Sequence, residues 1–278
     1  MKFVTKVFLL IIYSFWLYAT NLLANQILVT PSRLVFEDGT RSGRVIVSNP
    51  SDQSADYRVV LDNRKMTLDG KIELISEPET GQLFADRILR YSPKKFSLEP
   101  KTSRTIRIKV RNLAELPAGE YRSHLKMEVL PKAVLPDLNA QNVKIQIQVN
   151  YGISIPLIVR KGDLKFALEV TDYQFDNGDC SRPNLQIMLK RTGDRSSFGD
   201  VSVFFINQQG QQSLVKHLKG ISVYTPNLQR QLNLDLNTEG RCLEAGQLKF
   251  IYSEHSASRD LPEIIAEDLI IDEKIIPL

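Results

Sequence analysis

The sequence contains few of the residues that most often carry catalytic or metal chemistry. Its 278 residues include only three histidines and two cysteines. None of the histidines, which are His124, His217 and His255, belongs to an H-x-x-x-H or Cys/His pattern, so no metal site is predicted. The sequence also has no G-x-S-x-G nucleophile motif. We therefore expect neither enzymatic activity nor a bound cofactor.

A large excess of charge of one sign is also lacking. The chain has 36 Lys and Arg residues against 32 Asp and Glu residues, a formal net charge of +4. It has no arginine-rich tract and no Gly-rich phosphate loop. Nucleic acid is therefore not an expected partner.

One long apolar run lies near the N-terminus. Lys2 and Lys6 form a short basic region, residues 7–19 are almost entirely apolar, and Ala24 offers a small residue for cleavage. This pattern predicts a secretory signal peptide over residues 1–24. The alternative is an uncleaved anchor, although the run is short for a membrane span of about 20 residues.

The two cysteines are Cys180 and Cys242. In an exported chain, an even number of cysteines indicates disulfide bonding. We therefore predict one disulfide between them. Two unpaired, buried thiols are the alternative.

Convincing helical periodicity is missing from the mature chain. Instead, apolar residues recur at every second position in short runs between turn residues, as in 106–110 and 125–129. Period-two alternation predicts β-strands with one buried face, and many such runs predict an all-β sandwich. The polar segment 191–200, which contains Ser196 and Ser197, predicts a solvated hairpin loop.

The length of the chain favours two domains. The segment from Val159 to Asp163 ends one strand pattern and precedes another, as expected of a domain junction. We predict one domain over residues 25–160 and a second β-sandwich over residues 161–278.

The longest alternating stretch runs from Val143 to Arg160. Its apolar residues are Val143, Ile145, Ile147, Val149, Tyr151, Ile153, Ile155, Leu157 and Val159. Gly152 and Pro156 interrupt it, so it is either one long edge strand or two strands joined at a kink. An ordinary half-buried strand explains this pattern, and so does a strand that lends its apolar row to another chain.

Four segments, taken in order, resemble the PapD-like periplasmic chaperones of the chaperone–usher pilus pathway. They are 33–36 with 45–49, 91–100 leading into 106–108, 116–123, and the alternating strand that ends at Arg160. Together they span about residues 27–160. The second half resembles the family only as a β-rich domain of suitable size.

The resemblance implies two immunoglobulin-like sandwiches set at an angle, with a ligand cleft between them. It implies that the last strand of the first domain completes the sandwich of a pilus or fimbrial subunit that lacks one strand. The implied subunit-binding residues are Arg33, Ile145, Ile147, Val149 and Tyr151. The implied location is the periplasm, and an outer-membrane usher is an expected further partner.

The sequence departs from this family in the anchor for the subunit's terminal carboxylate. The family uses an arginine near the start of domain one and a lysine in the long strand. Arg33 matches the arginine, but Pro156 stands at the lysine position, and Arg122 stands where the family has an acid. Arg160 is either a second anion ligand or part of a salt bridge at the domain junction.

Two functions remain open at this point. One is a strand-donating chaperone for surface-fibre subunits, and the other is a secreted two-domain structural or adhesive module. They differ in whether the row formed by Ile145, Ile147 and Val149 is exposed. Ile155 and Val159 follow Gly152 and approach the domain junction, so we expect them to be buried in either case. An exposed apolar row also predicts self-association of the free protein.

Overall fold

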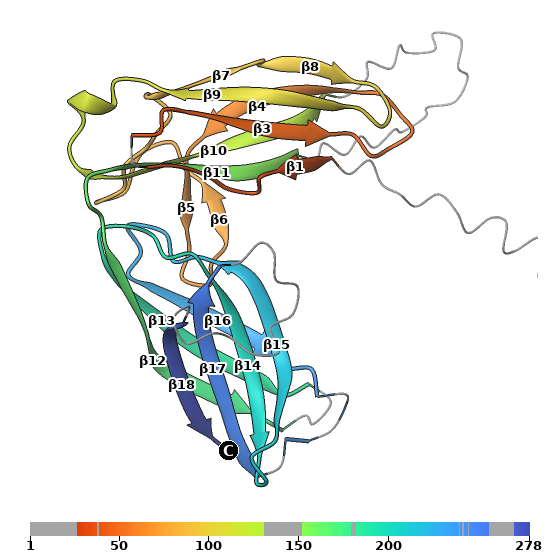
Figure 1. The fold of residues 1–278 in the computed structure, drawn as a ribbon, viewed down its shortest axis with the longest axis vertical. Helices are drawn as coiled ribbons and strands as arrows, with labels where there is room; N and C mark the ends of the chain where they lie inside the picture. Colours follow the sequence, from red (N-terminus) through yellow and green to blue (C-terminus); the bar gives the residue numbers. More distant parts are fainter. Residues whose placement is uncertain are drawn as a thin grey trace, which may run out of the picture.

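The computed structural model describes residues 27–37, 39–130, 152–178, 182–238, 240, 242–243, 245–255 and 270–278. It consists of two β-sandwiches whose long axes meet at an angle (Figure 1). The predicted all-β class and the angled pair of sandwiches are confirmed. No helix in the described part of the chain is long and apolar enough to cross a membrane.

The first sandwich is built from two sheets. One sheet has the strand order β1-β3-β9-β7, and the other has the order β2-β11-β10-β4-β8. Their bounds are β1 Leu28–Thr30, β2 Leu34–Phe36, β3 Ser42–Ser48, β4 Ala55–Asp62, β7 Leu89–Ser92, β8 Lys95–Leu98, β9 Ser103–Val110, β10 Gly119–Leu130 and β11 Gly152–Lys161. A short 3₁₀ helix, Leu113–Glu115, precedes β10.

The second sandwich also has two sheets, with orders β12-β13-β16 and β15-β14-β17-β18. Their bounds are β12 Phe166–Asp176, β13 Asn184–Gly193, β14 Gly199–Asn207, β15 Gln212–Ile221, β16 Gln229–Asp235, β17 Gly246–Glu254 and β18 Ile270–Pro277.

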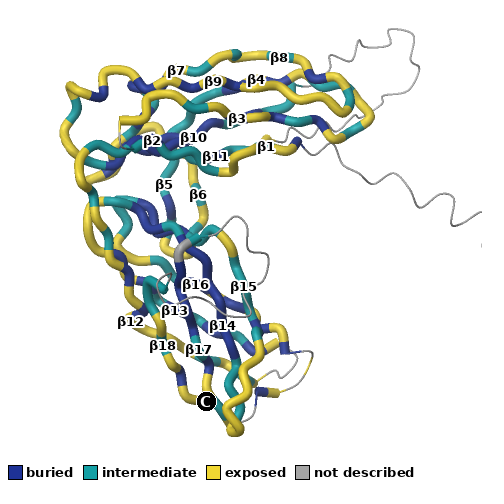
Figure 2. Tube along the Cα trace, in the orientation of Figure 1, coloured by how far each residue is buried: buried dark blue, intermediate teal, exposed yellow. Residues whose placement is uncertain are grey.

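Each sandwich has its own apolar core, as the buried interiors in Figure 2 show. The cores follow from the period-two alternation, because successive side chains of a strand point to opposite faces. In β9, Ile106, Ile108 and Val110 are buried, whereas Arg107 and Lys109 are exposed.

A two-stranded hairpin extends from the first sandwich to the second (Figure 1). Its strands are β5 Arg64–Met66 and β6 Ile72–Leu74. The Asn227 side chain donates to the Met66 carbonyl over 2.8 Å, and the Gln231 backbone N–H donates to the Leu68 carbonyl over 2.8 Å. The hairpin therefore fixes the second sandwich to the first at a point far from the covalent linker.

Candidate functional site

The strand β11 has one fully paired side and one partly paired side. On one side it pairs with β10 from Gly152 to Lys161. On the other side β2 pairs in parallel with Leu157, Ile158 and Val159 alone. Within the described residues, the edge from Gly152 to Pro156 therefore has no strand beside it.

The odd-numbered residues of β11 face the core of the first sandwich. Ile155, Leu157 and Val159 are 3 % exposed or less, and Ile153 packs against the same cluster. The expected burial of Ile155 and Val159 is confirmed. The four implied strand residues before them, Ile145, Ile147, Val149 and Tyr151, lie outside the described residues.

Gly152 is needed where the described part of β11 begins. A Cβ at this position would lie 2.6 Å from the Met127 carbonyl oxygen and 3.1 Å from the Glu128 Cα. Real Cβ atoms do not approach backbone so closely. The glycine therefore lets β11 stay close to β10 up to this point.

On the opposite face of β11, Ile158 packs at the junction with the second sandwich. Ile158 is fully buried in a small cluster with Met66 and Tyr224, against which Val35 and Ile72 pack. This cluster brings together β11, the β5–β6 hairpin and a loop of the second sandwich. It forms the apolar centre of the junction.

Arg33 lies at this junction, immediately before β2. Its guanidinium donates to the Ser222 hydroxyl over 3.3 Å and lies 4.2 Å from the centre of the Phe198 ring. Its Nε–H has no hydrogen-bond partner among the described residues. Burial lowers the pKa of Arg33, although nearby Tyr224 and Glu120 favour its charged form. Arg33 therefore contacts both sandwiches.

Pro156 lies beside Arg33, because Leu34 pairs with Leu157 on the neighbouring strand. On its other side Pro156 pairs with His124 of β10. The His124 side chain is buried, and burial lowers its pKa to about 3, with further lowering by the charges of Arg122 and Arg64. His124 is therefore neutral at neutral pH and does not replace the missing lysine charge. His124 lies within β10.

Arg122 is almost fully buried, with 4 % of its surface exposed. Its guanidinium lies 4.3 Å from the centre of the Tyr224 ring and donates to the Thr225 carbonyl over 3.3 Å. The second sandwich therefore covers this arginine.

The buried acid of β10 is Glu120, two residues before Arg122. It accepts hydrogen bonds from the Ser196 backbone N–H over 3.1 Å, from the Thr225 hydroxyl over 3.2 Å and from the Ser196 hydroxyl. Arg160 Nε donates to it over 3.0 Å. Burial by itself would raise the pKa of Glu120, but the Ser196 hydrogen bonds and the Arg160 charge outweigh burial and lower it.

Arg160 joins two acids of the first sandwich. Besides Glu120, it pairs with Glu37 over 2.7 Å. Glu120 also accepts hydrogen bonds from Ser196 and Thr225, so these ion pairs of the first sandwich are joined to the second sandwich by hydrogen bonds.

The predicted solvated loop over 191–200 is wrong. Ser196 and Ser197 are 1 % and 0 % exposed, because this segment lies against the first sandwich and the 222–225 loop. Ser197 Oγ accepts from the Val223 backbone N–H over 2.9 Å, and Ser196 Oγ accepts from that of Thr225 over 3.0 Å. Polar composition predicted solvent contact, whereas these hydroxyls satisfy buried backbone donors.

Sequence reasoning did not identify Glu120, Arg195 or Tyr224 as junction residues. The pairing of Glu120 with Arg160 follows from the β10–β11 register, which the alternation of each strand taken alone does not reveal. Arg195 and Tyr224 lie in loops of the second sandwich, where no alternation marks a residue as buried.

A cavity of about 520 Å³ lies between the sandwiches next to Arg33. It is lined by Arg33, Val35, Glu37, Arg160, Phe166, Arg195, Ser196, Phe198, Ile270 and Ile271. We refer to it as the junction cavity. It combines three arginines with apolar walls.

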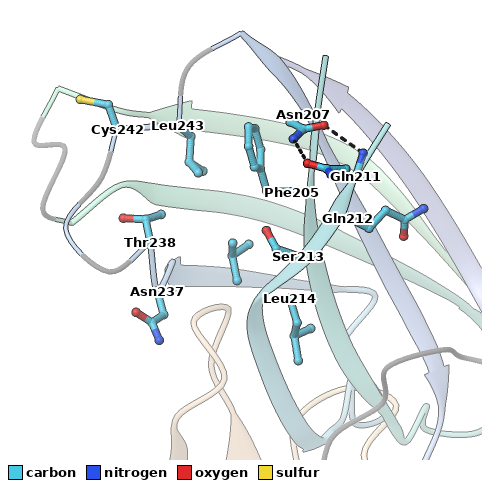
Figure 3. A pocket seen from close by; sticks show the side chains of 11 residues that line it. Phe205, Asn207, Gln211, Gln212, Ser213, Leu214, Asn237, Thr238, Cys242 and Leu243 are labelled. Atoms are coloured by element: carbon cyan, nitrogen blue, oxygen red, sulfur yellow. Dashed lines mark hydrogen bonds between the residues drawn. The ribbon is translucent and has the colours of Figure 1, made fainter. Parts of the chain in front are cut away.

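A second cavity, of about 460 Å³, lies in the second sandwich near the turn between β14 and β15 (Figure 3). Asn207 and Gln211 cross that turn with a side-chain hydrogen bond of 2.9 Å. None of the described residues that line this cavity is charged. It therefore offers no anchor for an ion.

Cys242 borders this second cavity and is disulfide-bonded. Cys180 lies outside the described residues, so the pairing of Cys180 with Cys242 stays a prediction. Among the residues that are described, no three His, Cys, Asp or Glu side chains form a group that could hold a metal ion.

Comparison with protein-family models found no match, and comparison with curated proteins found none either. Three similar solved structures illustrate the likeness to known folds. The class 5 fimbriae chaperone CfaA is 13 % identical, with 91 % of this chain and 100 % of that chain covered and a TM-score of 0.44. The Pseudomonas aeruginosa CupB2 chaperone is 14 % identical, with 90 % and 100 % covered and a TM-score of 0.43.

The third is a structure of the Salmonella enterica SafA pilin in complex with the SafB chaperone. The likeness has 15 % identity, covers 84 % of this chain and 94 % of that chain, and has a TM-score of 0.41. Likeness at this level of identity concerns the path of the polypeptide, and function depends on the site.

Proposed function

We propose that this protein is a periplasmic chaperone that binds pilus or fimbrial subunits by donating an edge β-strand. The observation that carries the proposal is the free edge of β11 from Gly152 to Pro156. In the sequence, the same alternation continues back through Tyr151 to Val143. The donor row is Ile145, Ile147, Val149 and Tyr151.

Strand donation follows from the needs of both chains. A subunit that lacks one strand exposes unpaired backbone N–H and C=O groups and an apolar slot. A donated strand pairs those groups, and each buried Ile or Val side chain contributes roughly 1.5–3 kcal/mol. The donor needs a strand that is fixed at one end and open along one edge. The burial of Ile155, Leu157 and Val159 supplies the fixed end.

Arg33 is the proposed anchor for the terminal carboxylate of the subunit. A planar guanidinium suits a carboxylate, and the Nε–H of Arg33 has no partner among the described residues. Arg160 is proposed as a junction residue and not as an anion ligand, because Glu37 and Glu120 already occupy its guanidinium. An outer-membrane usher is the proposed receiver of the loaded complex.

The test compares Ile147→Thr with Ile155→Thr. Each variant is measured for thermal stability and for capture of fibre subunits from a periplasmic extract, identified by mass spectrometry. If the strand is a donor, Ile147→Thr leaves stability nearly unchanged and reduces subunit capture. Ile155→Thr instead costs about 1–3 kcal/mol of folding stability, because Ile155 belongs to the core.

The opposite result for Ile147→Thr would refute strand donation. A large loss of stability with no separate loss of capture means that the row packs inside the protein. The protein would then be a structural or adhesive module.

A further inference from the structure

We propose that the outer sheet of the first sandwich binds the surface of a membrane that contains anionic phospholipid. This sheet has the strand order β1-β3-β9-β7 and does not contain β11. Its solvent-facing side carries four cations, Arg44, Arg90, Arg107 and Lys109, and we refer to this side as the basic face. The proposal goes beyond subunit binding, because the free edge of β11 belongs to the other sheet.

The strand register brings the four cations together. Arg44 of β3 lies directly opposite Arg107 of β9, and Arg90 of β7 lies directly opposite Lys109 of β9. Arg107 and Lys109 are two residues apart on one strand, so they point to the same side of the sheet. Ile108, between them, is buried in the core and points to the other side. The two pairs are therefore neighbours on the solvent-facing side.

No acid of the outer sheet balances these charges. Its four strands contain no Asp or Glu residue. All four cations are exposed, and none of them forms an ion pair with a described residue. Arg90 donates to the backbone carbonyls of Arg87 and Leu89, which does not neutralise its charge. The basic face is therefore a local excess of positive charge on a chain that is nearly balanced overall.

The cations on the other sheet of the same sandwich are paired with an acid. Arg58 of β4 pairs with Glu128 of β10 over 2.6 Å, and Lys126 pairs with the same acid over 3.0 Å. Arg44 and Arg107 instead face each other, and like charges directly opposite on a sheet are destabilising. An anionic surface against the basic face would therefore supply the neutralisation that Glu128 provides on the other sheet.

Two exposed apolar side chains lie on the same side of the outer sheet. Ile46 of β3 is two residues from Arg44 and is 38 % exposed, and Leu28 of β1 is 57 % exposed. Thr30 lies opposite Ile46 and two residues from Leu28, so Leu28 shares this side. A membrane surface presents anionic phosphates next to hydrocarbon. It therefore accepts both the cations and the apolar side chains.

An acidic protein surface fits the basic face less well. Long Arg and Lys side chains lose rotamer freedom when each is held against one fixed acid, and exposed pairs of this kind contribute little. Lipid headgroups move laterally, so they gather beside cations that keep much of that freedom. A charged protein surface would also offer no hydrocarbon to Leu28 and Ile46. Both differences favour a lipid surface.

Membrane binding in this orientation would leave the proposed subunit site accessible. The edge of β11 from Gly152 to Pro156 belongs to the sheet on the other side of the core. In Figure 1, β7 and β9 lie on the side of the first sandwich that is away from the second sandwich. The protein could therefore lie on a membrane and still present the edge of β11 to a client.

The test measures binding of the exported protein to lipid vesicles by flotation. Anionic vesicles contain phosphatidylglycerol and phosphatidylcholine in equal parts, and neutral vesicles contain phosphatidylcholine alone. Poly-glutamate is the probe for an acidic protein partner. The test variants are Arg107→Gln combined with Lys109→Gln, and Ile46→Thr. Lys165→Gln combined with Lys190→Gln is the matched control, because it removes two exposed positive charges from the second sandwich.

We expect the native protein to bind anionic vesicles but not neutral ones, and binding should weaken as the salt concentration rises. The Arg107 and Lys109 double variant should weaken binding about twenty- to thirtyfold, since each cation near an anionic surface contributes about fivefold. Ile46→Thr should weaken it about threefold, and the control should change it less than about twofold. The double variant should stay folded, because it removes charges that repel one another.

Equal binding to neutral and anionic vesicles would overturn the proposal, and so would equal losses in the double variant and the control. Binding of poly-glutamate without binding of anionic vesicles would also overturn it, and would assign the basic face to an acidic protein. The double variant should capture subunits normally, because it leaves β11 unchanged. Failure of vesicle binding would therefore leave strand donation intact, and failure of subunit capture by the native protein would leave the basic face intact.

Discussion

At the scale of single residues, the junction is organised by charged groups that have lost most of their water. Glu120 and Arg122 are 3 % and 4 % exposed, and His124, two residues further along β10, is 3 % exposed. Glu120 accepts hydrogen bonds that outweigh its burial and keep it ionised, whereas burial, helped by the charges of Arg122 and Arg64, lowers the pKa of His124 and keeps it neutral. The stability of the protein should therefore depend on pH in two separate ranges.

His124 should make the protein less stable as the pH falls below about 6.5. The unfolded chain takes up a proton near the ordinary histidine pKa of 6.5, whereas the folded protein does so only near pH 3. Stability should therefore fall by about 1–2 kcal/mol between pH 6.5 and pH 5. Denaturant unfolding at each pH measures this loss, and His124→Phe should remove it. If the free energy of unfolding of His124→Phe falls with pH as steeply as that of the native protein, His124 is not the cause of the loss.

Glu120 should act in a lower pH range. Its folded pKa is lower than its ordinary value of 4.5, so its contribution is present above pH 4.5 and is lost as the pH falls below that value. Glu120→Gln removes one of the two carboxylates that pair with Arg160 in a buried site. It should lower the free energy of unfolding by about 3 kcal/mol at pH 7. Chemical denaturation at pH 7 and pH 4 tests both points. Glu128→Gln, whose acid is paired near the surface, should cost less than about 1 kcal/mol.

At the scale of secondary-structure elements, the β5–β6 hairpin and the outer sheet of the first sandwich have different roles. The hairpin contacts the second sandwich through Met66 and Leu68. The outer sheet instead exposes a row of cations on β3, β7 and β9. The hairpin fixes the angle between the sandwiches. On the outer sheet, cations of neighbouring strands lie opposite one another.

Gly70 lies at the turn of the hairpin, where it has a φ of 82°. The positive φ disfavours any other residue, and a Cβ there would lie 2.4 Å from Arg230 Nε, so the Arg230 side chain of the second sandwich would have to move. Gly70→Val should lower stability by about 1–3 kcal/mol and loosen the junction. Thermal unfolding and small-angle scattering measure these effects. Gly210→Val has a similar φ but open space around it, so it should affect stability without changing the domain angle.

Arg44 of β3 lies directly opposite Arg107 of β9. Like charges in this position are destabilising, and an opposite-charge pair contributes roughly 0.2–1 kcal/mol. Arg44→Glu should therefore raise the free energy of unfolding by up to about 1 kcal/mol at low salt. The gain should shrink in 1 M salt, because screening weakens the interaction between exposed charges. A stability that does not change with salt would contradict this explanation.

At the scale of the whole molecule, the two sandwiches enclose the junction cavity. On the first sandwich, the edge of β11 from Gly152 to Pro156 has no strand beside it within the described residues. The edge and the cavity are close together, because β2 follows Arg33, contributes Val35 to the cavity and pairs with β11. On the proposed function, a client that pairs with the edge would lie next to the cavity. Strand pairing and the anchor for the chain end would then act on the same bound chain.

If Ile145, Ile147 and Val149 form the proposed donor row, the free protein should self-associate through it. An exposed apolar row beside a free edge is prone to pair with a second copy. Ile147→Thr should shift the equilibrium toward the monomer, as measured by analytical ultracentrifugation over a range of concentrations. Ile46→Thr is the control, because Ile46 is an exposed apolar residue on a different sheet. Association that responds equally to both substitutions would rule out the donor strand as its cause.

The period-two alternation was sufficient to predict an all-β chain, because alternation reports directly which face of a strand is dry. It also predicted the burial of Ile155 and Val159, since these residues continue one apolar row. The partners of Arg33, Glu120 and Arg195 could not be predicted in this way. They come from loops and strands up to 189 residues apart in the chain, as with Arg33 and Ser222.

Ser196 and Ser197 show the physical reason. Polar residues without alternation predict solvent, but a buried polar group is equally stable when its hydrogen bonds are made inside the protein. Whether those partners exist depends on how the two sandwiches meet, which no local pattern encodes. The sequence alone therefore determines the strands and their dry faces. Only the tertiary structure decides which charged and polar side chains meet at the junction.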